Sequence, residues 1–107
     1  MVFDLSKIEG FEWDEGNITK NKEKHEVDYK ECEEVFLNAP VRVFDDEVHS
    51  KKEKRYGALG KTNSNRRLVI FFTIRNKRIR VISARDQGEK DRKVYEAVEK
   101  NFERKER

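Results

Sequence analysis

The stretch RRLVIFFTIRNKRIRVISAR, residues 66–85, decides the fold of this chain. It contains two segments rich in Val, Ile and Phe, residues 66–75 and 78–85, and this composition is typical of β-strands. The two residues between the segments, Asn76 and Lys77, suit a tight turn because Asn tolerates a positive φ. The stretch therefore predicts an antiparallel β-hairpin.

The hairpin also assigns side chains to the two faces of a sheet. A two-residue turn pairs Arg75 with Arg78 and so fixes the register of both strands. One face is then apolar and predicts the core, with Ile70, Phe72, Ile74, Ile79 and Val81. The opposite face is cationic near the turn and carries Thr73, Arg75, Arg78 and Arg80, with the pair Phe71 and Ile82 beyond them. Arg85 falls on the apolar face of a regular strand, so we expect it beyond the strand end or at a bulge.

Two more strands are expected before the hairpin, at residues 41–45 and 55–62. Gly57 and Gly60 interrupt the second of these, where a bulge or a close approach of another chain segment is expected. Residues 68–74 are apolar on both faces, which suits a central strand covered on both sides. Residues 1–16 show no sustained period and predict an extended lead-in or a short strand.

Three helices complete the pattern. We expect Asn17 to cap a first helix that ends at His25, and the capping-box residues Asp28 and Glu31 to open a second, which Pro40 ends. Residues 87–102 predict a third, with ion pairs four residues apart, including Glu96 with Lys100. The predicted fold class is α+β, an antiparallel four-stranded sheet with two N-terminal helices and one C-terminal helix.

The composition bears on whether the chain is folded or disordered. Of the 107 residues, 44% are charged, against about 25% in an average soluble domain, and only 35% are hydrophobic. The chain nevertheless has 27 Leu, Ile, Val and Phe residues and a net charge of only +3. This composition is more apolar and less charged overall than that of disordered chains. We expect one domain, residues 1–107, which leaves no room for a dinucleotide-binding domain with a substrate domain, a TIM barrel or a kinase.

Several classes of site are not expected. No apolar run approaches the roughly 20 residues that span a bilayer, and the first ten residues include Asp4, Lys7 and Glu9 where a secretory signal is apolar. The chain is therefore expected in the cytoplasm and away from membranes. Cys32 is the only cysteine, and it has no zinc-site spacing with His25 or His49, so we expect neither a metal nor a cofactor.

The small net charge conceals opposed blocks. Residues 1–50 contain 6 basic and 14 acidic residues, a net charge of −8. Residues 51–85 contain 12 basic residues and one acidic residue, a net charge of +11, while residues 86–107 balance at 7 and 7. The central block predicts a phosphate-rich partner. The alternative is a solvated basic face that pairs with the acidic first half.

Several motifs in the chain resemble the BrnT toxin family. They are FEWDEGN at residues 11–17, KH at 24–25, HSKKEKR at 49–55 and IRVISAR at 79–85, in this order over residues 10–96. Glu26 departs from the family, which usually has Gly after the Lys-His pair. The resemblance implies a RelE-like fold, a type II toxin with endoribonuclease activity of the mRNA interferase kind, and an RNA substrate. It also implies a BrnA-like protein antitoxin whose dimer would give a heterotetramer, and operator DNA contacted through that antitoxin.

Metal-free RNA cleavage needs groups that bind the phosphodiester, stabilise negative charge and transfer protons. Guanidinium groups suit the first two tasks and an imidazole suits the third. We expect His49 to transfer protons, oriented by Glu53 four residues later. The complete set of expected catalytic residues is His49, Glu53, Arg55, Arg80 and Arg85, and the expected RNA-binding residues are Lys24, Arg75 and Arg78.

Other interpretations stay open at this point. Arg80 can pair with a carboxylate of the first half or of the last helix, and His49 can be a loop residue hydrogen-bonded near Ser50. The whole chain can be a non-catalytic nucleic-acid-binding module or repressor subunit that uses the same basic face. The face can also dock an acidic protein.

Overall fold

The predicted hairpin is present. The structure is a computed structural model that describes residues 4–106, and in it β4 (Arg67–Arg75) and β5 (Arg78–Asp86) are antiparallel. Asn76 and Lys77 form the turn with φ values of 51° and 63°. Positive φ at both turn residues gives the twist that a two-residue hairpin needs. The register confirms Arg75 opposite Arg78 and Thr73 opposite Arg80.

A β-bulge alters the register further along the hairpin. Phe71 lies opposite Ser83 and not Ile82, so the predicted Phe71–Ile82 pair is wrong. The extra residue on β5 reverses which side chains face which side beyond it. Arg85 therefore lies opposite Val69 and leaves the core face to Ala84, which is fully buried.

The sheet has five strands and not the four expected. Its order is β1-β5-β4-β3-β2, with β4 at the centre, and three antiparallel pairs join β5 to β2. The extra strand, β1, pairs in parallel with β5, so the sheet is mixed. The remaining strand bounds are β1 (Gly10–Phe11), β2 (Arg42–Asp45) and β3 (Tyr56–Lys61).

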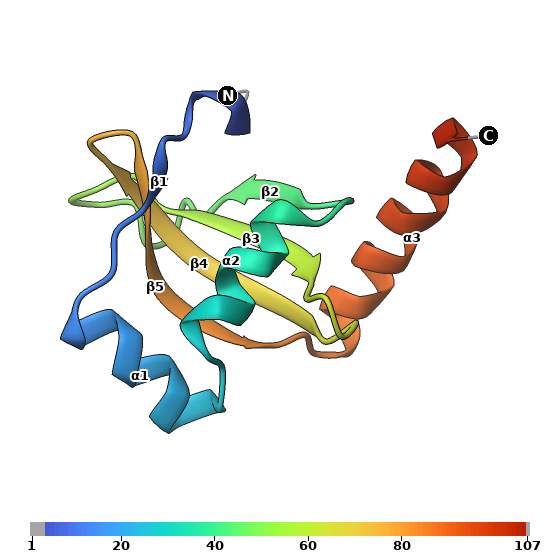
Figure 1. The fold of residues 1–107 in the computed structure, drawn as a ribbon. Helices are drawn as coiled ribbons and strands as arrows, with labels where there is room; N and C mark the ends of the chain where they lie inside the picture. Colours follow the sequence, from blue (N-terminus) through green and yellow to red (C-terminus); the bar gives the residue numbers. More distant parts are fainter. Residues whose placement is uncertain (1–3, 107) are drawn as a thin grey trace.

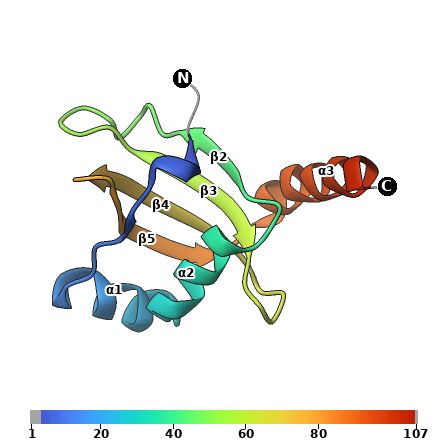
Figure 2. The ribbon, with the colours of Figure 1, turned by 45° about the horizontal axis from the view of Figure 1, so that its top comes forward.

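Helices lie on both faces of this sheet, as Figures 1 and 2 show. α1 (Glu15–His25) and α2 (Tyr29–Leu37) cover one face, after a single 3-10 turn at Leu5–Lys7. α3 (Glu89–Glu106) packs with its first half against the other face and then projects away from the sheet. The α+β class is confirmed, although α3 begins two residues later and ends four residues later than predicted.

The helix starts test the capping predictions. Asp28 caps α2, and Glu31 completes the box, as expected. The cap of α1 is Asp14, so the prediction of Asn17 is wrong. Asn17 is instead the third helical residue, and its side-chain Oδ1 accepts a hydrogen bond from the Asp14 backbone N–H at 2.8 Å. Asp and Asn both suit the cap of a helix, and the sequence alone does not choose between Asp14 and Asn17.

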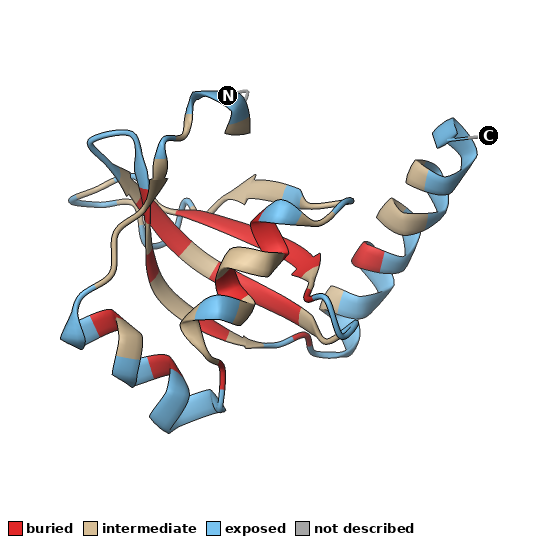
Figure 3. Cartoon of the chain, viewed as in Figure 1, coloured by how far each residue is buried: buried red, intermediate tan, exposed pale blue. Residues whose placement is uncertain are grey.

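The main core lies between the sheet and the first two helices, where the buried residues concentrate (Figure 3). It contains the predicted apolar face of the hairpin together with Val27, Cys32, Val35 and Phe36. A smaller cluster on the other face joins Tyr95 of α3 to Leu59 and Val69. Both strand glycines admit a close neighbour, since Val35 lies against Gly60 and the ring of Phe44 lies across Gly57.

Two buried amides of α1 close the outer edge of β5 beyond the short strand β1. Asn17 Nδ2 donates to the carbonyl of Val81 at 3.2 Å, and Asn21 Oδ1 accepts from the N–H of Ala84 at 3.0 Å. These backbone groups flank the bulge and have no strand partner there, so the amides satisfy groups that would otherwise be buried unpaired. The helix thus fixes the hairpin at the point where its register changes.

Candidate functional site

The face of the sheet opposite α1 and α2, called here the outer face, holds the candidate site. α3 covers the end of this face near Leu59 and Val69. Toward the hairpin turn the face is hollowed by a cavity of about 190 Å³, lined by Asp46, His49, Arg55, Phe71, Ile82 and Ser83. A neighbouring hollow of about 430 Å³ is lined by Val48, His49, Lys51, Lys52, Glu53 and Arg55. His49 and Arg55 belong to both.

The connection between β2 and β3, residues 46–55, brings these side chains together. Its two ends are joined because the Asp46 N–H donates to the Arg55 carbonyl at 3.0 Å. The Ser50 hydroxyl donates to the Asp46 carbonyl at 2.6 Å and accepts from the Arg55 N–H at 2.9 Å. These bonds close the loop and fix its two ends beside the cavity.

Asp46 orients His49. The imidazole Nδ1 lies 3.0 Å from Oδ2 and 3.2 Å from Oδ1 of Asp46, whose side chain is only 11% exposed. The imidazole itself is 61% exposed, and its Nε2 has no protein partner among residues 4–106. A carboxylate bonded to one ring nitrogen holds the tautomer and leaves the other nitrogen for a ligand. Ser50 bonds to backbone groups and not to His49, so the hydrogen-bond partner of this loop histidine is Asp46.

Glu53 does not have the predicted role. Its carboxylate accepts hydrogen bonds from Arg75 Nε at 2.8 Å and Arg75 Nη2 at 3.0 Å. The bond from Arg75 lowers the pKa of Glu53, and the same pair raises the pKa of Arg75. Residues 51–53 form bends and not the helical turn that would bring Glu53 under His49, so the prediction that Glu53 orients His49 is wrong.

Arg55 is the unpaired cation of the cavity. Its side chain is partly buried at the start of β3, and within the described part of the chain it makes no side-chain hydrogen bond or ion pair. A partly buried guanidinium that no carboxylate holds in an ion pair favours a bound anion. Its fork of donors matches the oxygens of a phosphate group.

Arg80 lies on the outer face but is paired, as one of the alternatives anticipated. Its Nη1 is 2.9 Å from Asp14 Oδ2 and 3.3 Å from Glu12 Oε1, and the side chain is 19% exposed. The hydrogen bond from Arg80 lowers the pKa of Asp14 below its usual range. Because Asp14 also caps α1, this contact connects the middle of β5 to the start of that helix.

The other predicted cations lie further out. Arg85 Nη1 bonds Asp91 Oδ2 in the first turn of α3 at 3.0 Å. Arg78 is exposed at the hairpin and lines a hollow of about 410 Å³ with Glu9, Glu12 and Asn76. Lys24 is exposed on α1, which packs on the opposite face, so the structure does not bring it to the cavity.

Four residues of the cavity received no role in the sequence analysis, namely Asp46, Phe71, Ile82 and Ser83. Asp46 stands three residues before His49, and this spacing would have identified it as an orienting group if the turn had been assumed. Phe71 was assigned to the outer face but given no role. Ser83 enters the cavity because of the β-bulge, and nothing in the sequence signals that change of register.

The cavity combines an oriented imidazole with an unpaired guanidinium, which suits proton transfer beside a bound phosphate. Within residues 4–106, no group of three or more His, Cys, Asp or Glu side chains is arranged to hold a metal ion. Across the same residues, no helix combines the length and the apolar character needed to cross a membrane.

Residues 13–91 match a known family, described as the ribonuclease toxin, BrnT, of type II toxin-antitoxin systems. A search of curated proteins gave no match. The matched segment contains the loop with His49 and Arg55 and the whole β4–β5 hairpin, and it ends in the first turn of α3. The chain therefore belongs to the BrnT family of ribonuclease toxins of type II toxin-antitoxin systems.

Proposed function

We propose that this ribonuclease cleaves RNA without a metal ion, at the cavity shared by His49 and Arg55. The observation that carries the proposal is the placement of an imidazole, oriented by the carboxylate of Asp46, beside a guanidinium that forms no ion pair within residues 4–106. We propose that residues 4–106 form one domain. We also propose that this domain acts on RNA in the cytoplasm.

The proposed reaction begins with attack of a ribose 2′-oxygen on the adjacent phosphorus. The bond from phosphorus to the 5′-oxygen of the next nucleotide breaks, which leaves a 2′,3′-cyclic phosphate and a 5′-hydroxyl. The 2′-hydroxyl loses a proton and the departing oxygen gains one. His49 Nε2 is the nitrogen that exchanges a proton with the substrate, because Asp46 holds Nδ1. Arg55 binds the phosphate oxygens as their charge increases.

The other predicted residues receive supporting roles. Glu53 positions Arg75 through the two bonds that join them, and Arg78 contacts a neighbouring phosphate from its exposed place at the turn. Arg80 and Arg85 bind phosphate only after exchanging their present carboxylate partners, Asp14 and Asp91, for the RNA. Lys24 has no part in this proposal.

Cleavage of a fluorescent RNA by the purified protein in EDTA tests the proposal. Arg55→Ala should lower the rate about 100-fold or more, or about 3 kcal/mol of barrier, because one transition-state donor is lost. Arg92→Ala is the matched control, since Arg92 is exposed on α3 and lines neither hollow of the site.

Three results would contradict the proposal. Loss of cleavage on addition of EDTA would show that a metal is needed. An unchanged rate in Arg55→Ala would remove Arg55 from the mechanism. RNA binding without any cleavage or growth arrest would favour the non-catalytic module in place of the enzyme.

The partner is a protein antitoxin, as the family implies. We propose that it is BrnA-like, that its dimer joins two toxin chains in a heterotetramer, and that it carries the contacts with operator DNA. Expression of the chain alone should arrest growth, and coexpression of the neighbouring gene product should relieve the arrest. Light scattering of the copurified complex then measures its stoichiometry.

A further inference from the structure

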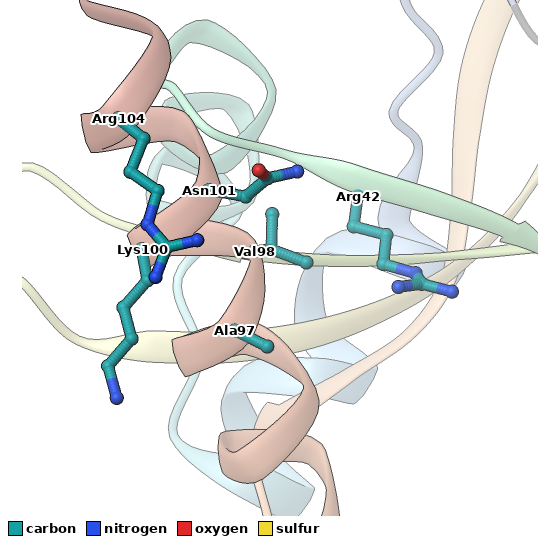
Figure 4. A pocket seen from close by; sticks show the side chains of 6 residues that line it. All are labelled: Arg42, Ala97, Val98, Lys100, Asn101 and Arg104. Carbon is teal, nitrogen blue, oxygen red and sulfur yellow. The ribbon is translucent and has the colours of Figure 1, made fainter. Parts of the chain in front are cut away.

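A second hollow lies away from the His49–Arg55 cavity, between α3 and the edge strand β2. Its volume is about 420 Å³. Figure 4 shows the side chains that line it. The lining side chains come from the projecting helix and from the first residue of the strand: Arg42, Ala97, Val98, Lys100, Asn101 and Arg104. We call it the α3–β2 groove.

The groove carries uncompensated positive charge. Three of its lining residues, Arg42, Lys100 and Arg104, are cationic, and no carboxylate lines it. Within the described residues none of the three belongs to an ion pair, and the predicted pair of Glu96 with Lys100 does not form. A group of cations that the protein leaves unpaired favours an anionic ligand.

The cations of the neighbouring sheet are different, because most of them are already neutralised. Arg67 pairs with Glu99 at 2.9 Å, and Arg66 pairs with Asp86 at 2.7 Å. Arg75, Arg80 and Arg85 also have carboxylate partners. The α3–β2 groove is therefore a separate positive site and not a continuation of a uniformly charged face.

The groove opens on the same face of the sheet as the cavity. Arg42 lies opposite Leu59, and Phe44, two residues along β2, lies opposite Gly57, so both point to the outer face. The ring of Phe44 meets that of Phe71 edge-on, with centroids 6.3 Å apart, and Phe71 lines the cavity. This aromatic pair separates the two hollows, and the length of β2 is only about 13 Å.

We propose that the α3–β2 groove binds phosphates of the RNA strand that flank the bond cleaved at His49 and Arg55. This inference rests on the proposed function. A strand leaving the cavity crosses the Phe44–Phe71 pair and reaches Arg42, Lys100 and Arg104, which bind its phosphates, while Asn101 offers an amide. Cationic grooves that follow the backbone are the usual means of holding single-stranded nucleic acid.

The lining favours RNA over a protein segment. The apolar part of the groove is Ala97 and Val98, and no aromatic side chain lines it. Protein interfaces depend on a few large buried anchors that fill well-packed pockets, and two small aliphatic side chains offer little to such an anchor. Phosphate binding needs only the cations and the amide that are present.

Fluorescence anisotropy with a labelled 12-nucleotide RNA tests the proposal. All of its ribose 2′-hydroxyls are methylated, so it binds without being cleaved. The double variant Lys100→Glu with Arg104→Glu should bind this RNA at least tenfold more weakly than the parent. Its plot of log affinity against log salt concentration should also lose about 1.4 in slope, or about 0.7 for each phosphate contact removed.

The matched control is Lys90→Glu with Arg92→Glu, which makes the same charge change on exposed residues of the same helix outside the groove. The control should bind nearly as the parent does. Cleavage of a dinucleotide, too short to reach the groove, should proceed at the parental rate in both double variants. Thermal unfolding checks that all three proteins are folded.

The outcomes separate this proposal from the catalytic one. Anisotropy reports on the groove even if the parent cleaves nothing, so a failed cleavage assay leaves the binding test intact. Equal weakening in the two double variants, or no weakening in either, would overturn the groove as an RNA site. Unchanged RNA affinity together with lost neutralisation by the antitoxin would also overturn it and assign the groove to the protein partner.

Discussion

Glu26 adopts the left-handed conformation at the end of α1, with φ 55° and ψ 36°. Its N–H bonds the carbonyls of Asn21 and Lys22 and so completes the last turn of the helix. This is the position where the BrnT family usually has Gly. A residue with a Cβ raises the free energy of the folded state by about 1 kcal/mol in this conformation, for steric reasons. The fold tolerates this strain because the following residue, Val27, is fully buried.

The substitution Glu26→Gly should therefore stabilise the protein by about 1 kcal/mol, measured as the free energy of unfolding in urea. Within residues 4–106 the exposed side chain of Glu26 makes no hydrogen bond or ion pair whose loss would offset this gain. Glu23→Gly, three residues earlier inside the helix, should instead destabilise by about 1 kcal/mol. Equal effects of the two changes would show that the left-handed backbone carries no strain.

Asp46→Asn is the sharpest test of how His49 is held. The amide can still occupy the site, but it no longer fixes the imidazole tautomer as a carboxylate does. We expect RNA cleavage to slow at least tenfold, which is about 1.4 kcal/mol, and the pH–rate profile to change shape. Asp45→Asn is the control, because Asp45 pairs with Lys54 at 3.6 Å and does not touch His49. A fall in RNA affinity with an unchanged profile would contradict the orienting role.

The site residues show where prediction from the sequence ends. His49 and Arg55 could be named because their chemistry and their place beside the basic block point to phosphate. The partner of His49 could not, since Asp46 and Glu53 stand at comparable distances along the chain and the choice depends on the loop conformation. The pairing of Arg80 with the first half was one of two expectations, and burial in three dimensions decides it.

At the scale of elements, the β4–β5 hairpin was predictable because turn chemistry and strand composition agree. The bulge at residue 82 was not, because one extra residue leaves the composition of a strand unchanged. The short strand β1 escaped for a different reason, since two residues cannot show a period. The bulge is contacted by the amides of α1, whereas β1 depends on its pairing with β5.

The contact between α1 and β5 yields a prediction of its own. Asn21→Ala should destabilise the protein by about 1–3 kcal/mol, because the buried N–H of Ala84 loses its acceptor. Urea unfolding measures this change. Asn101→Ala is the matched control, since Asn101 is an exposed amide in α3 and makes no hydrogen bond among the described residues, so both changes gain the same helix propensity. Similar changes in the free energy of unfolding in the two variants would contradict the proposed role of Asn21.

At the scale of the whole molecule, the opposed charge blocks meet as ion pairs that join distant elements. Arg66 bonds Asp86 at the end of β5, Glu31 in α2, and the carbonyls of His25 and Glu26 at the end of α1. The bond from Arg66 lowers the pKa of Asp86, as the bond from Arg75 lowers that of Glu53. From the acidic first half, Glu31 pairs with Arg66, and Glu12 and Asp14 pair with Arg80.

Stability should consequently fall in acid. These carboxyls have folded-state pKa values below their unfolded values of about 4, so the stability they contribute is complete above pH 5 and is lost as the pH falls through the folded pKa values. Tm measured from pH 6 to pH 2.5 should decline, and the decline should be smaller in Asp86→Asn. Glu103→Gln, at an exposed and unpaired residue, should follow the parent. A Tm that stays level across this range would contradict the role of the pairs.

Asp14 makes two contacts at once, and this affects how the molecule responds to ligands. Its carboxylate caps the first turn of α1 and also holds Arg80 on β5. An anion that draws Arg80 away must therefore loosen a helix start on the opposite layer, and the coupling is reciprocal, since whatever tightens that helix weakens the affinity of Arg80 for the anion. The start of α1 is in this way coupled to the outer face of the sheet, although no residue of α1 lines the cavity.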